Sequence, residues 1–473
     1  MHRRHWRAVM AVMILGLLGG SPASGAEKVF RAGAYAQNVN PKKYPVSVNG
    51  NFSDRLAKGA IDPLHARCLV LDDGTTQVAF CVVDSCMIPR EVVDAAKRLA
   101  QKTTGIPGGN IIISATHTHT APTLAGVFQS EANPEYVRQL AEQIAEGIQK
   151  AHQARQSAQI GWGTANNARQ VFNRRWFREQ ALIPRDPFGR TTDKVQMNPG
   201  YQAKGLERPA GPTDPTVSVL SVQTAAGEPL ALLANYSLHY VGGVDALSAD
   251  YFGVFAERIK ELVKGPASFV GILSNGTSGD INNINFGGSA PGSRRPGEQM
   301  RNVAYDVADT ALEAYRKIKH TDKVNLAAAA QELELGVRLP DEKDLERARE
   351  VLEKARGRVL RTSEEVYARE TTLMAKYPAK VQAMLQVVRI NDLAICSIPC
   401  EVFVEIGLEL RKQSPFRHTF VIELANGYNG YLPTPKQHAL GGYETWRARS
   451  SYLEVDASTK ITRVLLGLLN QVK

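Results

Sequence analysis

The chain has 473 residues, of which 43% are hydrophobic and 22% are charged, and its formal net charge is +10 at pH 7. The length allows one large domain or two to three ordinary ones, and the composition is that of a soluble globular protein. No RNA- or DNA-binding motif accompanies the positive charge, so we expect no nucleic-acid partner.

The first 26 residues have the pattern of a secretory signal peptide. The basic segment MHRRHWR is followed by the apolar run AVMAVMILGLLGG (residues 8–20) and by the small residues SPASGA. This order predicts cleavage after Ala26 and export, either to a periplasm or out of the cell. The apolar run is too short to span a bilayer comfortably.

Strand-like and helical runs then alternate along the chain. The hydrophobic spacing predicts strands at 65–73, 77–84, 110–117 and 158–165, and helices at 90–103 and 133–154. This order predicts the α/β fold class, with mixed, largely buried β-sheets flanked by helices.

Residues 165–215 are rich in Asn, Arg, Pro and Gly, and we expect long surface loops there. Strands are predicted again at 216–224 and 229–240. Residues 339–385 carry apolar side chains at helical spacing opposite a charged face, which predicts an inserted helical hairpin. Further strands are expected at 383–391 and 393–399.

Five cysteines are few for an exported protein. Cys68 and Cys81 lie in apolar runs, where a buried thiol is the default role. Cys396 and Cys400 have a spacing that allows a bridge, so we expect one or two disulfides at most.

A pair of histidines follows the apolar run 111–113, in the segment SATHTHTAP. Residues i and i+2 of an extended chain point to the same face, so His117 and His119 can both bind one metal ion, or one can bind while the other serves a substrate. Alone, an H-x-H pattern is a weak signal, and hydrogen-bonded histidines remain the alternative.

Four other segments place polar residues at the ends of apolar strands. His239 lies at the end of the apolar strand in ANYSLHY, and a glycine- and asparagine-rich turn follows at 274–286. Glu401 follows SIPC and opens an expected helix, and LANGYNGYLPT is an aromatic turn. Each has an ordinary structural explanation. Together they matter because ligands bind beyond the carboxyl ends of strands in α/β sheets.

The ordered set of motifs resembles the catalytic domain of the neutral ceramidases, which are zinc amidases that cleave the N-acyl bond of ceramide. The resemblance rests on ISATHTHTAP, NRR, LHYVGG with LSADYFG, SNGTSGDINN, IPCEVFVEIG and ANGYNGYLPT with GGYE. It implies one zinc hydrolase domain over residues 27–473, with 339–385 as an excursion within it. Because the chain ends soon after Tyr443, we expect no C-terminal β-sandwich domain of the kind that full-length ceramidases carry.

The resemblance also assigns roles to individual residues. It implies that Zn²⁺ is the cofactor and that its ligands are His117, His239, Glu401 and Tyr431. It implies a catalytic set of His119, Arg174 and Tyr443, with Asn282 at the position of the family's serine and Arg175 where a serine is usual. Two imidazoles and a carboxylate suit a catalytic zinc ion, and a histidine, an arginine and a tyrosine can move protons and stabilise an oxyanion.

The residue at 282 leaves the function open. Family members have a serine there that acts as a nucleophile or a substrate contact, and an amide is a poor nucleophile. We therefore expect an exported zinc hydrolase that cleaves a C–N amide bond by attack of water, with an N-acyl sphingolipid such as ceramide as one substrate. The alternatives are an ester or another N-acyl substrate at the same site, or a non-catalytic descendant that binds lipid or glycan. We expect a small-molecule amide or lipid partner, compatible with peripheral membrane contact, and no obligate protein partner.

Overall fold

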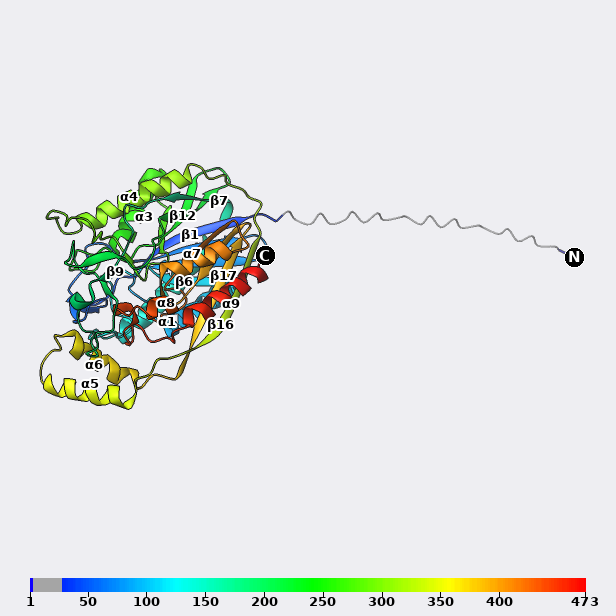
Figure 1. The fold of residues 1–473 in the computed structure, drawn as a ribbon. Helices are drawn as coiled ribbons and strands as arrows, with labels where there is room; N and C mark the ends of the chain where they lie inside the picture. The colour runs from blue at the N-terminus through cyan, green and yellow to red at the C-terminus, as the bar shows by residue number, and fades with distance from the viewer. Residues whose placement is uncertain (3–27) are drawn as a thin grey trace.

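The structure, a computed structural model, describes residues 1–2 and 28–473. The expected signal peptide, residues 1–26, lies almost entirely outside the described residues. Two β-sheets packed face to face form the centre, and helices cover their outer faces (Figure 1). Of the described residues, 29% are in helices and 29% in strands. The expected α/β class, with mixed sheets flanked by helices, is therefore confirmed.

The larger sheet contains both parallel and antiparallel pairs. From edge to edge it runs β14 (Val270–Asn275), β13 (Pro229–Tyr236), β12 (Thr216–Thr224), β7 (Gln156–Asn166), β1 (Arg31–Asn38), β4 (His65–Asp72), β5 (Gln77–Val83) and β6 (Ile111–Ala115). The pairs β13–β14 and β5–β6 are parallel, and the others are antiparallel. The edge strand β14 also contacts β4, β5 and β6, so the sheet is strongly curved.

The smaller sheet packs on the inner face of the larger one. Its order is β16 (Leu326–Gly336), β17 (Lys380–Ile390), β18 (Leu393–Ser397) and β20 (His418–Ile422). Alternate residues of a strand face opposite sides, so Leu69 and Leu71 of β4 pack in the core between the sheets with Ile395 and Phe420. Cys68 of the same strand faces the outer helices instead.

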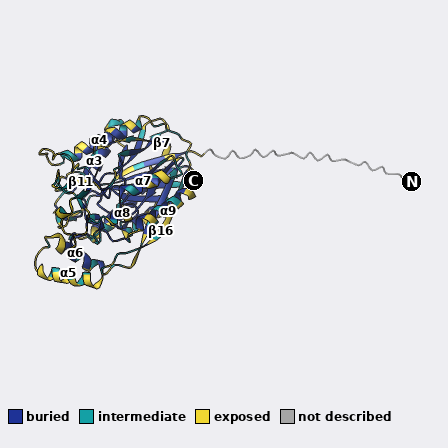
Figure 2. Ribbon diagram, viewed as in Figure 1, coloured by how far each residue is buried: buried dark blue, intermediate teal, exposed yellow. Residues whose placement is uncertain are grey.

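Helices form the two outer layers. The larger sheet is covered by α1 (Arg90–Thr104), α2 (Pro134–Gln153), α3 (Asp250–Leu262) and α4 (Glu298–Tyr315), and the smaller sheet by α7 (Val404–Gln413) and α9 (Ala457–Gln471). Figure 2 shows the strands as the most deeply buried layers. The expected helices at 90–103 and 133–154 are confirmed as α1 and α2. The helix α2 begins where expected because Asn133 caps it and Pro134 occupies its first turn.

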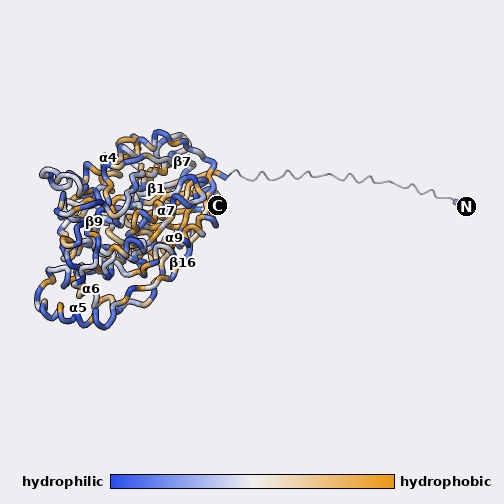
Figure 3. Tube along the Cα trace, viewed as in Figure 1, coloured by the Kyte–Doolittle hydropathy of each residue, from blue (hydrophilic) through white to orange (hydrophobic). Residues whose placement is uncertain are grey.

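The inserted helical hairpin is present but shorter than expected. It consists of α5 (Glu342–Lys354) and α6 (Ser363–Met374), each begun by a capping box. Figure 1 shows it projecting from the sheets, and Figure 3 shows that many of its residues are hydrophilic. The predicted range 339–385 was wrong at its end, because β17 already starts at Lys380 and pairs with β16 along its whole length.

Most of residues 165–215 is irregular, as expected, but the expectation of loops alone was wrong. A small sheet forms there from β10 (Val195–Met197), β9 (Arg175–Arg178) and β11 (Leu206–Pro209). The remaining short elements are β2 (Val46–Val48), β3 (Arg55–Ala57), β8 (Phe172–Asn173), β15 (Ile281–Asn282), β19 (Glu401–Val402), β21 (Tyr431–Leu432), α8 (Pro435–His438), and the 3-10 turns η1 (Gly108–Asn110), η2 (Gln180–Leu182) and η3 (Tyr443–Thr445). These strands span only two to four residues, which is too short for a hydrophobic period to show in the sequence.

All five cysteines are buried, and none of them forms a disulfide. Cys68 and Cys81 face each other across β4 and β5 with their sulfur atoms 3.4 Å apart. Cys396 and Cys400 are not bridged. Within the described residues, we find no helix that combines the length and the apolar character needed to cross a bilayer.

Candidate metal centre

The two histidines after β6 are brought together by a turn. The strand ends at Ala115, and His117 has a φ of 69°, in the left-handed region that residues other than glycine seldom adopt. The N–H of His117 donates to the carbonyl of Ser85 at 2.8 Å. Nε2 of His119 lies 3.2 Å from Nε2 of His117. The expectation that an extended chain would place both rings on one face was therefore wrong, although the rings do meet. The left-handed φ of His117 is a strained conformation for a residue other than glycine, and strain of this kind is typical of functional sites.

His117 and His239 each present Nε2 to the same point. His239 follows the carboxyl end of β13, and its Nε2 is 3.0 Å from Nε2 of His117. Nδ1 of His117 lies 2.7 Å from the carbonyl oxygen of Cys86, and Nδ1 of His239 lies 3.1 Å from that of Ser278. A carbonyl only accepts hydrogen bonds, so each Nδ1 donates. This tautomer leaves a lone pair on each Nε2 for a metal ion.

Glu401 completes this group from the second sheet. It lies in β19, which pairs in parallel with β21 so that Glu401 is directly beside Tyr431. The expectation that Glu401 opens a helix was wrong, because α7 begins only at Val404. Oε1 of Glu401 accepts a hydrogen bond of 2.9 Å from the hydroxyl of Tyr428. Oε2 is buried without a hydrogen-bond partner and lies 3.3 Å from Nε2 of His117 and 3.9 Å from Nε2 of His239.

The donor set fits a metal ion. The three ligand atoms of His117, His239 and Glu401 all lie within 4.8 Å of one another, and all three residues are buried. Two nitrogens and one carboxylate oxygen form the protein part of a catalytic zinc site, which keeps a fourth position open. A buried carboxylate oxygen without a hydrogen-bond donor is costly. A cation bound at this point would satisfy it, so the group can hold a metal ion.

The charges around this point agree with cation binding. Burial opposes ionisation of Glu401, but the neighbouring His117 lowers the pKa of its carboxyl. Burial likewise disfavours the charged form of His117, yet Glu401 raises the pKa of that imidazole well above its usual value. A proton and a metal ion therefore compete for Nε2 of His117. Burial, together with the positive charges of His117 and Arg174, lowers the pKa of both His119 and His239.

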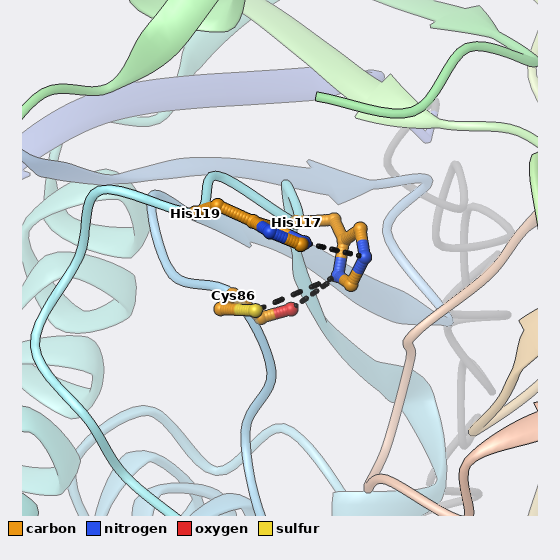
Figure 4. A group of neighbouring side chains, drawn as sticks. All are labelled: Cys86, His117 and His119. Atoms are coloured by element: carbon orange, nitrogen blue, oxygen red, sulfur yellow. Dashed lines mark hydrogen bonds between the residues drawn. The ribbon is translucent and has the colours of Figure 1, made fainter. Parts of the chain in front are cut away.

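A second group of donors lies on the other side of His117, where Figure 4 shows Cys86, His117 and His119. Sγ of Cys86 is 3.9 Å from Nδ1 of His117. That nitrogen already donates to the backbone carbonyl of Cys86, so it carries a proton and has no lone pair for a metal ion. The group of His117, His239 and Glu401 is therefore the better metal site.

Arg174 reaches the site from the turn between β8 and β9. Its Nη2 donates to the hydroxyl of Tyr431 at 3.0 Å and to the carbonyl of Gly279 at 2.8 Å, and its Nε donates to Glu444 at 3.0 Å. The side chain is nearly completely buried. These three bonds fix the guanidinium beside Tyr431, and so place a permanent positive charge at the edge of the histidine group.

Arg175 supports the site structurally, through hydrogen bonds to its surroundings. It is fully buried, and its Nη1 donates to the other carboxylate oxygen of Glu444 at 2.6 Å. Its Nη2 donates to the carbonyl of Gly441 at 2.7 Å. Glu444 thus binds both arginines, and this arrangement ties the segment that carries Tyr443 to the turn that carries Arg174.

The two tyrosines implied by the family resemblance lie next to each other. The ring centroids of Tyr431 and Tyr443 are 5.8 Å apart, in an edge-to-face arrangement. Tyr431 is buried, whereas Tyr443 is half-buried at the start of η3 and also contacts Trp446. The structure therefore brings both side chains to the metal group, while their roles as ligand and catalyst stay predictions.

Asn282 lies on a neighbouring segment with its amide already bonded. Nδ2 donates to Oδ1 of Asn198 at 3.0 Å, and Oδ1 accepts from the N–H of Ile284 at 3.0 Å. Its strand, β15, pairs with β8, which leads directly into Arg174. The side chain at the family's serine position therefore supports the local turn.

Sequence reasoning missed several residues that shape the site. Tyr240 stacks on the ring of His119, with centroids 3.5 Å apart and an angle of 14° between the planes. Gly50, in the loop between β2 and β3, lies against the same ring. Tyr428 lies within one of the quoted motifs, where its hydrogen bond to Glu401 could have been suspected. Gly50 gives no signal in sequence, because its importance depends on a contact across the fold.

Solved structures share this fold. The neutral ceramidase from Pseudomonas aeruginosa matches with a TM-score of 0.71 and 17% sequence identity, over 93% of this chain and 74% of that chain. A structure described as a ceramidase complexed with C2 matches with a TM-score of 0.70 and 17% identity, over 93% of this chain and 75% of that chain. No family model matches the sequence. The fold implied by the motifs is thus confirmed, and activity has to be argued from the residues.

Proposed function

We propose that this ceramidase-fold chain is an exported, zinc-dependent hydrolase that cleaves a C–N amide bond, with an N-acyl lipid such as ceramide as the candidate substrate. The observation that carries the proposal is the convergence of Nε2 of His117, Nε2 of His239 and the unbonded Oε2 of Glu401. Export rests on the signal-peptide pattern of residues 1–26, and a lipid substrate would require peripheral contact with a membrane or a lipid carrier.

The donor set suits zinc because it combines imidazole nitrogens with one carboxylate oxygen. His117, His239 and Glu401 would hold the ion, and Tyr431 is the candidate for an additional contact. When bound, zinc would lower the pKa of a water molecule and polarise the scissile carbonyl.

The surrounding side chains supply the remaining chemistry. The low pKa of His119 keeps its imidazole neutral near pH 7, so its Nε2 can accept a proton from the attacking water and pass it to the leaving nitrogen. Arg174 and Tyr443 would stabilise negative charge on the carbonyl oxygen of the substrate. The stacked ring of Tyr240 and the contact with Gly50 hold His119 in a fixed orientation.

Asn282 favours a second candidate, a descendant that binds lipid or glycan without turnover. Its amide cannot act as the family's serine does, and both of its polar groups are bonded to neighbouring residues. We favour hydrolysis because water can attack directly when His119 and the metal group are present, and this route needs no acyl-enzyme.

A substrate panel tests the proposal. The mature chain is incubated with an N-acyl sphingosine, an N-acyl amino acid and a matched ester, and products are measured by mass spectrometry. We expect about one zinc ion per chain and release of a carboxylic acid from at least one amide. His117→Ala and His239→Ala should lose both zinc and turnover. Full zinc occupancy in both variants would refute the site, and zinc binding without turnover of any substrate would favour the binding protein.

A further inference from the structure

A buried carboxylate behind the metal group connects the two segments that carry His239 and Glu401. Glu423 follows the carboxyl end of β20 and is fully buried. Its Oε1 accepts a hydrogen bond of 2.5 Å from Oγ of Ser278. Its Oε2 accepts from the N–H of Ser278 at 3.2 Å and from the N–H of Val402 at 2.6 Å. One carboxylate thus holds the turn after β14 against strand β19.

Both residues that Glu423 binds, Ser278 and Val402, are directly linked to a proposed metal ligand. The carbonyl of Ser278 is the acceptor that orients the ring of His239, and Val402 is the neighbour of Glu401 in β19. The N–H of Gly279 also donates to the carbonyl of Val402 at 2.8 Å. Glu423 therefore sets the distance between the segment that orients one ligand and the segment that carries another.

Both oxygens of Glu423 accept hydrogen bonds. Two N–H groups and one hydroxyl point at them, although burial raises the pKa of this carboxyl to about 8 from 4.5. A glutamine at this position has nearly the same shape and can keep its oxygen on the two N–H groups, but its NH₂ group then removes the acceptor of the Ser278 hydroxyl. The substitution Glu423→Gln therefore disturbs the spacing of the two segments with little change in volume.

We propose that Glu423 is a positioning residue that holds His239 and Glu401 at the separation required for metal binding. The proposal rests on the proposed function, since it presupposes that the histidine group binds zinc. Partners that orient the ligands of a metal typically contribute about 10- to 100-fold to metal affinity.

The control for this test is a second fully buried glutamate outside the site. Glu370 in α6 accepts hydrogen bonds from the backbone N–H and from the guanidinium of Arg449, at 2.7 to 3.2 Å. Glu370→Gln thus removes a comparable buried carboxylate without touching the segments of His239 and Glu401.

The experiment measures zinc affinity by competition with a chromogenic chelator, using the full mature chain. Thermal unfolding of the metal-free proteins is measured in parallel, to separate loss of stability from loss of metal binding. We expect Glu423→Gln to bind zinc about 10- to 100-fold more weakly than the wild type, and Glu370→Gln to bind it with wild-type affinity. A merely structural role would lower the unfolding temperature of both variants and leave their zinc affinities alike.

The outcomes separate this inference from the proposed function. Wild-type zinc affinity in a folded Glu423→Gln overturns the positioning role and leaves the metal site standing. If the wild type binds zinc no better than His117→Ala, both the positioning role of Glu423 and the proposed metal site are refuted. Should Glu423→Gln fail to fold, Ser278→Ala decides, because it removes only the hydroxyl that Oε1 of Glu423 accepts from. Unchanged zinc affinity in that variant overturns the proposal, and weakened affinity supports it.

Discussion

Gly50 lies so close to His119 that a Cβ atom built on it would be 2.3 Å from Nδ1 of the imidazole. Its φ of 101° also belongs to the region that favours glycine. Because the ring of His119 is confined by Tyr240 as well, Gly50→Ala should displace it while leaving His117, His239 and Glu401 in place. We expect about a tenfold or greater loss of turnover with normal zinc content, since a displaced general base loses part of its contribution.

Gly59→Ala is the control for this variant, because a Cβ at that position has no atom within 4 Å. Turnover and zinc content are measured for both variants with the best amide of the substrate panel. Equal turnover in Gly50→Ala and Gly59→Ala would remove His119 from the mechanism or show that its ring can move without cost.

Tyr443 is expected to act on the substrate and not on the metal ion. Its ring packs against Tyr431, on the side of the site where Arg174 lies. Tyr443→Phe should reduce kcat about a hundredfold with zinc still bound, by analogy with the loss of one oxyanion-hole donor. Tyr305→Phe, on an exposed tyrosine of α4, is the control. An unchanged kcat in Tyr443→Phe would exclude the hydroxyl from catalysis.

The bonded amide of Asn282 predicts a reaction without a covalent intermediate. Asn282→Ala should leave turnover within a few-fold of wild type, because the variant loses two hydrogen bonds of the turn, worth about 1 kcal/mol each, and no reacting group. Rapid-quench mass spectrometry should detect neither a burst nor an acyl adduct. An adduct on Thr277 or Ser278 would show instead that a neighbouring hydroxyl acts as the nucleophile.

The complementary variant places the family's serine at position 282. Asn282→Ser should raise activity towards ceramide-like amides, provided that the turn keeps its shape with Asn283 in place. The comparison with Asn282→Ala shows whether any gain comes from the new hydroxyl. Equal activity of the two variants on every amide would indicate that position 282 does not contact the substrate.

Asp250 should make the stability of the protein depend on pH. Burial raises the pKa of this carboxyl to about 6 from 3.8, against the effect of hydrogen bonds from the backbone N–H groups of Tyr251, Gly242 and Val241. Between pH 4 and 6 the folded state therefore holds a proton that the unfolded state has released. This stabilising contribution is complete below pH 4 and is lost as the pH rises through 6, on the order of 3 kcal/mol.

Urea unfolding at several pH values measures this contribution as a difference between proteins. In Asp250→Asn the fall in the free energy of unfolding between about pH 3 and 7 should be smaller than in the wild type by that amount. Asp322→Asn, on an exposed carboxyl, should keep the wild-type slope. The same slope in Asp250→Asn and Asp322→Asn would contradict the assignment.

The sequence predicted the apolar framework well, because periodic burial leaves a periodic pattern. Helices α1 and α2 and the antiparallel pair β4–β5 lie close to their predicted ranges. The hairpin of α5 and α6 was predicted in kind, but its end was misplaced, since the apolar residues at the start of β17 also fit a helical spacing. Local patterns therefore predicted which elements form, whereas the end of the hairpin depends on the pairing of β17 with β16.

The site itself was only partly predictable. The motifs pointed to His117 and His239, but the left-handed turn that orients His117 depends on its bond to Ser85, which no local pattern encodes. The pairing of Glu401 with Tyr431 likewise arises only when two distant segments meet. Contacts of this kind, formed across the fold, are what single-sequence patterns cannot supply.

X-ray absorption at the zinc edge of the zinc-loaded wild type tests the central claim most directly, because the two candidate donor groups differ in sulfur. Binding by His117, His239 and Glu401 predicts nitrogen and oxygen ligands only, at about 2.0–2.2 Å. A sulfur ligand at about 2.3 Å would place the ion against Cys86, on the opposite side of His117, and would contradict the account.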